Sequence, residues 1–168
     1  MRFLIAGIGS IGRRHLRNLR ALGETDILFL RSKPTPASDS ELAGFPTYIN
    51  MEEAFHAKPD AIIICTPTAL HMAVAIPGAK AGCHLMIEKP LACFSAELFP
   101  LLPIVEQNNV KVLSAFQFRF HPGLRKIRSL LDSNVIGNVL QADCCWGEYL
   151  PGCTLGRTTA LVTAPELI

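Results

Sequence analysis

The chain has 168 residues, enough for one domain, or for one domain and part of a second. Hydrophobic residues make up 49% of it and charged residues 18%, a composition typical of globular proteins and not of disordered ones. The formal net charge of +2 is too small to indicate a nucleic-acid partner. No apolar run approaches the roughly 18 residues of a membrane span, so we expect no membrane partner.

The six cysteines include no CxxC pair, which argues against a metal site and against a disulfide framework. Cys65 ends an apolar run, and Cys144 and Cys145 stand in another, where cysteine acts as a small hydrophobic residue. The apolar N-terminus is too short, and too interrupted by glycine, for a signal peptide. Together these features predict a cytoplasmic protein with reduced thiols.

Short apolar runs alternate with segments of helical spacing along most of the chain, beginning with the run RFLIA, which ends at Gly7. Such runs are typical of buried parallel strands. The alternation predicts an α/β fold with a Rossmann-type, doubly wound parallel sheet. In chain order, we expect strand 2–6, helix 11–22, strand 27–30, helix 52–56, strand 60–67, helix 70–81, strand 84–90, helix 95–108 and strand 110–120.

The pattern changes after residue 121. An amphipathic helix is expected over 124–133 and a strand over 139–149, which together are too little for a core of their own. We therefore divide the chain into a dinucleotide-binding domain at 1–121 and the start of an α/β C-terminal domain at 122–152. Residues 153–168 form a tail of a different character.

The stretch GIGSIG has the form GxGxxG and lies between a strand and a helix, which is the context that this motif requires. Gly7 permits the tight turn, Gly9 allows a pyrophosphate to approach the backbone, and Gly12 allows close packing of helix and strand. A helix starts at this loop, and Ser10 and Ile11 stand in its first turn. The free backbone N–H groups of this turn favour the binding of an anion. We predict that these residues bind a dinucleotide.

About 20 residues further on, an NAD-binding chain carries Asp or Glu at the end of the second strand. Here the strand ends in Arg31, Ser32 and Lys33, with no acid. Arg31 is suited to pair with a 2′-phosphate, assisted by the other two residues, so we predict NADP, with NAD as the alternative. Ordinary exposed loop charges would give the same pattern.

Two further strand ends carry candidate site residues, because doubly wound sheets bind ligands at their carboxyl edge. Thr66 and Pro67 follow the third strand and would lie under the nicotinamide ribose, with His71 beyond them as a ligand or as a capping or packing residue. Glu88 and Lys89 end the fourth strand. Lys89 is suited to proton transfer with a substrate hydroxyl. Glu88 is suited to orienting the Lys89 side chain or to contacting the ribose.

The motifs GIGSIGRRHLRNL, ICTPTALH, HLMIEKPLA and FQFRFHPGL, in this order and spacing, resemble the glucose–fructose oxidoreductase/inositol dehydrogenase family over residues 1–152. The resemblance implies NAD(P)-dependent oxidation or reduction of a sugar or nucleotide-sugar hydroxyl. It implies that Lys89 assists proton transfer and that Arg119 and His121 border the substrate. It also implies a homo-oligomer for full-length members.

Family members are about twice as long, and their C-terminal domain carries an Asp and a His that complete the acid–base machinery. Residues 153–168 contain no such pair. Two alternatives to a sugar oxidoreductase therefore stay open: a nucleotide-binding fragment without turnover, and a module that senses NADPH. Relatives continue after GEYLPG with Trp-His-Pro-Trp-Glu-Asp-Tyr-Arg, which a neighbouring reading frame of Cys153–Glu166 can also encode. We expect that this tail arises from a frameshift, with a genuine short tail as the alternative.

Overall fold

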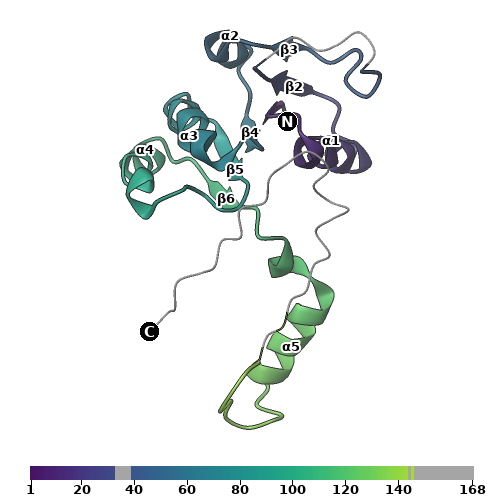
Figure 1. The fold of residues 1–168 in the computed structure, drawn as a ribbon, viewed down its shortest axis with the longest axis vertical. Helices are drawn as coiled ribbons and strands as arrows, with labels where there is room; N and C mark the ends of the chain where they lie inside the picture. Colours follow the sequence, from purple (N-terminus) through teal and green to yellow (C-terminus); the bar gives the residue numbers. More distant parts are fainter. Residues whose placement is uncertain (33–38, 144, 146–168) are drawn as a thin grey trace. The chain divides into compact units, whose positions relative to one another are not determined.

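A computed structural model of the protein describes residues 1–32, 39–143 and 145 (Figure 1). The chain divides into two compact units, Met1–Phe120 and His121–Ile168, which are described separately below. The predicted Lys33 and the tail at 153–168 lie outside the described residues.

The first unit is built on a parallel sheet of six strands in the order β3-β2-β1-β4-β5-β6. This order reverses between β1 and β4, as in a Rossmann fold, and confirms the predicted doubly wound sheet. The strands are β1 (Phe3–Ala6), β2 (Ile27–Leu30), β3 (Thr47–Tyr48), β4 (Ala61–Ile64), β5 (His84–Ile87) and β6 (Val112–Ser114).

Helices cover both faces of this sheet, with α1 on one side and α3 and α4 on the other (Figure 1). The α-helices of the unit are α1 (Ser10–Ala21), α2 (Met51–His56), α3 (His71–Lys80) and α4 (Leu101–Gln107). Short 3-10 helices cover Thr68–Leu70, Ser95–Leu98 and Gln117–Phe120.

The two hydrophobic cores follow from the alternation of side chains along each strand. In β1, Leu4 points into the core shared with α2, α3 and α4, whereas Ile5 points into the core beneath α1. Ile62 and Ile63 of β4 divide in the same way. Because both faces are buried, the strands are almost purely apolar, which is why the sequence predicts them well.

Three predictions of secondary structure are corrected in this unit. The expected strand 110–120 is confined to β6, and 117–120 is 3-10 helix. β6 is an edge strand with half-exposed Val112 and Leu113, so an apolar run there does not indicate a long buried strand. The expected helix 95–108 is interrupted near Pro100, which cannot donate a helical hydrogen bond. The two-residue β3 was missed because it is too short to show a pattern.

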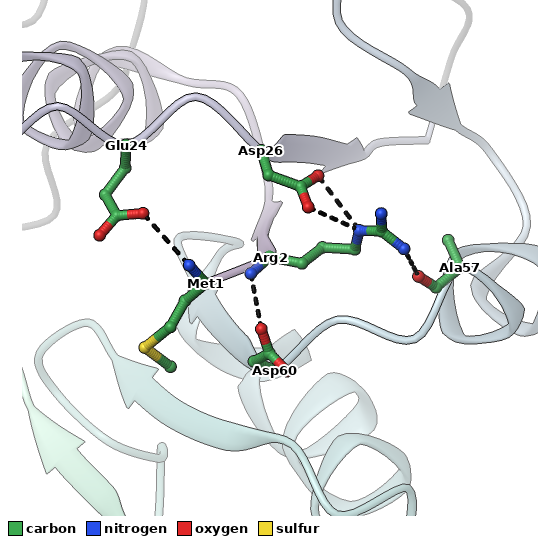
Figure 2. A network of polar contacts seen from close by, with 6 residues as sticks. All are labelled: Met1, Arg2, Glu24, Asp26, Ala57 and Asp60. Atoms are coloured by element: carbon green, nitrogen blue, oxygen red, sulfur yellow. Dashed lines mark hydrogen bonds and ion pairs between the residues drawn. The ribbon is translucent and has the colours of Figure 1, made fainter.

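The residues before three strands hold the amino edge of the sheet together (Figure 2). Arg2, Asp26 and Asp60 directly precede β1, β2 and β4. The Arg2 guanidinium donates to both carboxylate oxygens of Asp26 at 3.0 and 3.1 Å and to the carbonyl of Ala57 at 2.6 Å. Its backbone N–H donates to Asp60 at 2.7 Å. The N-terminal amine adds an ion pair with Glu24 at 3.4 Å.

The described part of the second unit contains α5 (Pro122–Asp132), close to the predicted helix 124–133. Proline at its first position fits the helix start, where no N–H is needed. The strand predicted for 139–149 is not formed at residues 139–143, and 146–149 lie outside the described residues. A strand requires a hydrogen-bonded neighbour, and the described residues of this unit offer none.

Candidate functional site

The carboxyl edge of the sheet brings together loops that are far apart in the sequence. Gly7, Cys65 and Glu88 directly follow β1, β4 and β5, whose registers place them side by side in one row. Their backbone N–H groups continue the sheet ladder, from Cys65 to the carbonyl of Ala6 at 2.7 Å and from Glu88 to that of Ile64 at 3.0 Å. The predicted sites after three strands therefore share the edge where the strand order reverses.

Two of the three loop glycines are required by close packing. Gly7 has φ +92°, and a Cβ on it would lie 2.8 Å from the backbone of Cys65 and Thr66. A Cβ on Gly12 would overlap the carbonyl oxygen of Gly7. The loop after β1 thus presses against the loop after β4 on one side and against its own helix on the other.

Gly9 differs from its neighbours because a Cβ built on it meets nothing within 4 Å. It is the N-cap residue of α1, and no acidic side chain stands in the first turn. Among the described residues, no side chain caps this helix end. The N–H groups of Ser10 and Ile11 have no partner within the helix. This open, donor-rich backbone fits a pyrophosphate.

The loop after β2 contains a negative charge beside the positive charges that the sequence predicted there. Arg31 and Ser32 are described there, and an acid further along the same segment, Asp39, lies close enough to feel the charge of Arg31. Its carboxylate accepts two hydrogen bonds from Arg13 of α1, at 2.5 and 3.0 Å. This contact lowers the pKa of Asp39, and the positive charge of Arg31 contributes to the shift.

A second acid completes this cluster. Glu41 accepts hydrogen bonds from Arg13 at 2.7 Å and from Arg17 at 2.8 Å. The guanidinium of Arg13 lowers the pKa of Glu41, and both carboxylates raise that of Arg13. Arg13 and Arg17 thus fasten the segment around Asp39 and Glu41 to helix α1.

The residues that follow β4 include one buried hydroxyl, that of Thr66, and one buried histidine, His71. Thr66 Oγ1 is buried and has no hydrogen-bond partner among the described residues, while Pro67 is exposed. His71 is 1% exposed, and its ring nitrogens lie 2.9 Å from the carbonyl of Thr66 and 3.2 Å from that of Leu91. His71 thus links two loops in the structure, while its predicted contact with a ligand stays a prediction.

At the end of β5, Glu88 pairs with a residue that the sequence analysis overlooked. His15 Nε2 lies 2.8 Å from Glu88 Oε1, and the two side chains are only 12% and 14% exposed. His15 stands one turn after Gly12 on the same face of α1. The spacing GxGxxG followed by xxH, which puts a histidine one turn into the helix, is the signal that the sequence offers for this residue.

Lys89 is exposed at this edge and lines an open cavity of about 340 Å³ whose other walls are largely apolar. Beside it, burial raises the pKa of the Cys65 thiol to about 12, and the charge of Glu88 adds to the rise. Cys65 is therefore no candidate nucleophile.

Arg119 lies near the end of the first unit, and His121 is the first residue of the second. Their predicted contact with substrate stays a prediction.

The comparisons with known proteins fit this geometry. The model of the Gfo/Idh/MocA oxidoreductase family, described by its NAD-binding Rossmann fold, matches residues 1–116. The chain belongs to this family. The match confirms the resemblance found in the sequence, and it supports a nicotinamide cofactor for the site at the sheet edge.

Individual relatives are similar over most of this chain. It is 26% identical to inositol 2-dehydrogenase of Rhizobium meliloti, covering 83% of this chain and 43% of that protein. It is 28% identical to UDP-N-acetylglucosamine 3-dehydrogenase of Acidithiobacillus ferrooxidans, covering 76% of this chain and 41% of that protein. The crystal structure of myo-inositol 2-dehydrogenase from Lactobacillus plantarum superposes with a TM-score of 0.73 at 26% identity, covering 83% and 43%.

The chain thus spans about two fifths of the length of these relatives. Within the described residues, no helix is both long enough and apolar enough to cross a membrane.

Proposed function

We propose that this chain binds NADP and forms the cofactor-binding part of an oxidoreductase that acts on a hydroxyl of a sugar or nucleotide sugar. The observation that carries the proposal is the open backbone at Gly9, where α1 presents free N–H groups beside the edge that also holds Lys89. The named substrates of the relatives, an inositol and a UDP-sugar, support the substrate class.

The glycine loop would hold the pyrophosphate. Gly7 and Gly12 shape it, Gly9 leaves the approach free, and Ser10 and Ile11 donate backbone N–H groups. When bound, the nicotinamide supplies hydride transfer at this edge. The hydroxyl of Thr66, which has no hydrogen-bond partner within the described part of the chain, is suited to the nicotinamide half, next to Pro67.

The preference for NADP over NAD rests on Arg31 and Ser32, with Lys33 following them in the sequence. A guanidinium at this place would pair with the 2′-phosphate. Asp39 already lies in the field of Arg31, and its negative charge opposes that preference. Titration of the purified chain with NADPH and NADH, followed by nucleotide fluorescence, tests the assignment. Tighter binding of NADH would overturn it.

Lys89 would hydrogen-bond the substrate hydroxyl and exchange its proton during the reaction. Glu88 would help to fix the position of this loop, since its Oε2 accepts from the Lys89 backbone N–H at 3.3 Å. Arg119 and His121 would contact the substrate, whereas the buried His71 would hold the loops in place. Homo-oligomerisation and a cytoplasmic location stay predictions.

Turnover is tested separately from binding. The chain is incubated with NADP⁺ and a panel of inositols and UDP-sugars, with Lys89→Met as the matched control. Reduction of NADP⁺ that depends on Lys89 supports the oxidoreductase. NADPH binding without turnover across the panel favours the other candidate, a cofactor-binding module.

A further inference from the structure

The hydrogen bond between His15 and Glu88 has no part in the pyrophosphate loop or in the proton transfer assigned to Lys89. It joins the second turn of α1 to the end of β5, at 2.8 Å between Nε2 and Oε1. Both side chains are largely buried, so this contact replaces water for both groups. A carboxylate oxygen can only accept, and the tautomer with a hydrogen on Nε2 makes this bond.

Glu88 is held at several points by this arrangement. Its backbone N–H donates to the carbonyl of Ile64 at 3.0 Å, which extends the sheet ladder. Its Oε1 meets His15, and its Oε2 accepts from the backbone N–H of Lys89 at 3.3 Å. The carboxylate therefore bridges helix α1 and the first residue of the loop after β5.

The same helix serves the phosphate end of the site. Its first turn, from Ser10, presents the free N–H groups, and His15 follows about one turn later. Because Gly12 packs against Gly7 at the end of β1, the helix cannot shift without disturbing the glycine loop. A rigid element that carries two groups of donors about one turn apart can set the distance between two parts of a long ligand.

We propose that His15 is a positioning residue that fixes Glu88, and through it the Glu88–Lys89 loop, for the nicotinamide half of the dinucleotide. This inference rests on the proposed function. It assigns two separable roles to α1. The first turn binds the pyrophosphate, and His15 positions the loop that contacts the nicotinamide half. Loss of the side chain should therefore weaken only ligands that reach the loop after β5.

The experiment compares a whole dinucleotide with its half in the full chain. The probes are NADPH and 2′,5′-ADP, or NADH and ADP if the wild type binds NADH more tightly. His15→Leu should weaken the dinucleotide about tenfold or more, the effect of losing a hydrogen bond to a charged group, and leave the half ligand unchanged. His15→Gln, whose amide reaches a similar place, should restore most of the affinity.

His56→Leu is the matched control, since His56 is exposed at the end of α2 and should change neither affinity. If His15→Leu does not fold, His15→Asn takes its place: it is polar but too short to reach Glu88, and should show the same selective loss. Thermal unfolding monitors the fold of each variant.

Three results would overturn the inference. An equal loss for dinucleotide and half ligand would mean that His15 supports the phosphate loop or the fold. Wild-type affinities in His15→Leu would mean that it positions nothing. A Gln variant as weak as the Leu variant would exclude the hydrogen bond as the cause. In each case the proposed function would stand, whereas a wild type that binds neither dinucleotide would overturn both.

Discussion

The two edges of the sheet use the same strands in opposite ways. At the amino edge, the residues before β1, β2 and β4 are Arg2, Asp26 and Asp60, and both aspartates accept hydrogen bonds from Arg2 (Figure 2). At the carboxyl edge, the residues after β1 and β4 are Gly7 and Cys65, which have no charge to share. The amino edge is closed by its own side chains, whereas the centre of the carboxyl edge presents backbone, between the charged residues Arg31 and Glu88 that follow β2 and β5.

The polar groups left at the carboxyl edge show what this difference means. Thr66 Oγ1 and Ser114 Oγ are buried there without hydrogen-bond partners among the described residues. Buried polar atoms are normally satisfied, so unsatisfied ones mark a place where something else completes the structure. The amino edge stabilises the fold, and the carboxyl edge is left for a ligand.

The largest expected effect is a change inside the glycine loop. Gly12→Ala would place a Cβ on the carbonyl oxygen of Gly7; the backbone fixes the position of the Cβ, and the oxygen itself belongs to the backbone, so neither can move aside. We expect a loss of at least about 3 kcal/mol in the free energy of unfolding, measured by urea denaturation. Dinucleotide binding should be lost with it.

Gly9→Ala is the control for this variant, because nothing lies within 4 Å of the added Cβ. Stability should change by less than about 1 kcal/mol, while dinucleotide binding weakens, since the methyl group fills the approach to the backbone. Equal losses of stability in the two variants would contradict the conclusion that Gly12 is closely packed and Gly9 is not.

The next effect concerns the buried thiol at the carboxyl edge. The pKa of Cys65 is raised from 9.0 to about 12, so below pH 9 the folded and unfolded chains are both protonated. Between pH 9 and 12 only the unfolded chain loses this proton, and stability falls by at most about 1.4 kcal/mol per pH unit. Urea unfolding at several alkaline pH values measures the slope.

Cys65→Ala should reduce this slope, and Cys93→Ala, which changes an exposed thiol, should not. Part of the slope should remain in Cys65→Ala, because burial also raises the pKa of Cys83. An unchanged slope in Cys65→Ala would mean that the thiol does not contribute.

A smaller effect is expected from the amino edge. Arg2→Met removes the hydrogen bonds to Asp26 and Ala57 but keeps the aliphatic stem. Because Arg2 is half-exposed, we expect only a modest fall in Tm, which high salt reduces, and no change in dinucleotide affinity. Arg20→Met is the control on an exposed helix position. Weaker dinucleotide binding in Arg2→Met would contradict the conclusion that the amino edge stabilises the fold without taking part in ligand binding.

The smallest effect concerns cofactor preference and rests on the proposal of NADP. Asp39→Asn removes a negative charge that Arg13 and Arg31 now neutralise. The ratio of NADPH to NADH affinity should rise about two- to fivefold, as expected for one partly exposed charge. Asp26→Asn, at the opposite edge, should leave the ratio unchanged. A fall in the ratio with Asp39→Asn would show that Asp39 supports 2′-phosphate binding.

How much the sequence predicts depends on the range of the interaction. The central strands and the glycine loop were predicted because their signals are local: apolar runs such as Ile62–Ile64, and GxGxxG between strand and helix. The contacts of Asp39 with Arg13, and of Glu88 with His15, join residues far apart in the chain. No periodicity encodes such pairs, so only the fold revealed them.

The strand predicted beyond residue 114 was wrong for a related reason. Val112 and Leu113 have the composition of a core strand, yet they lie half-exposed on an edge. Composition reports how apolar a segment is, while burial depends on which neighbours the topology supplies.

The contacts of His71 also constrain how the site can move. One buried ring lies against the carbonyl of Thr66 and against that of Leu91, and so bridges the loops after β4 and β5. Neither loop can swing outward alone without breaking a contact in the protein interior. Opening of this edge is therefore a cooperative event of both loops, and their amides should exchange with solvent at a common rate.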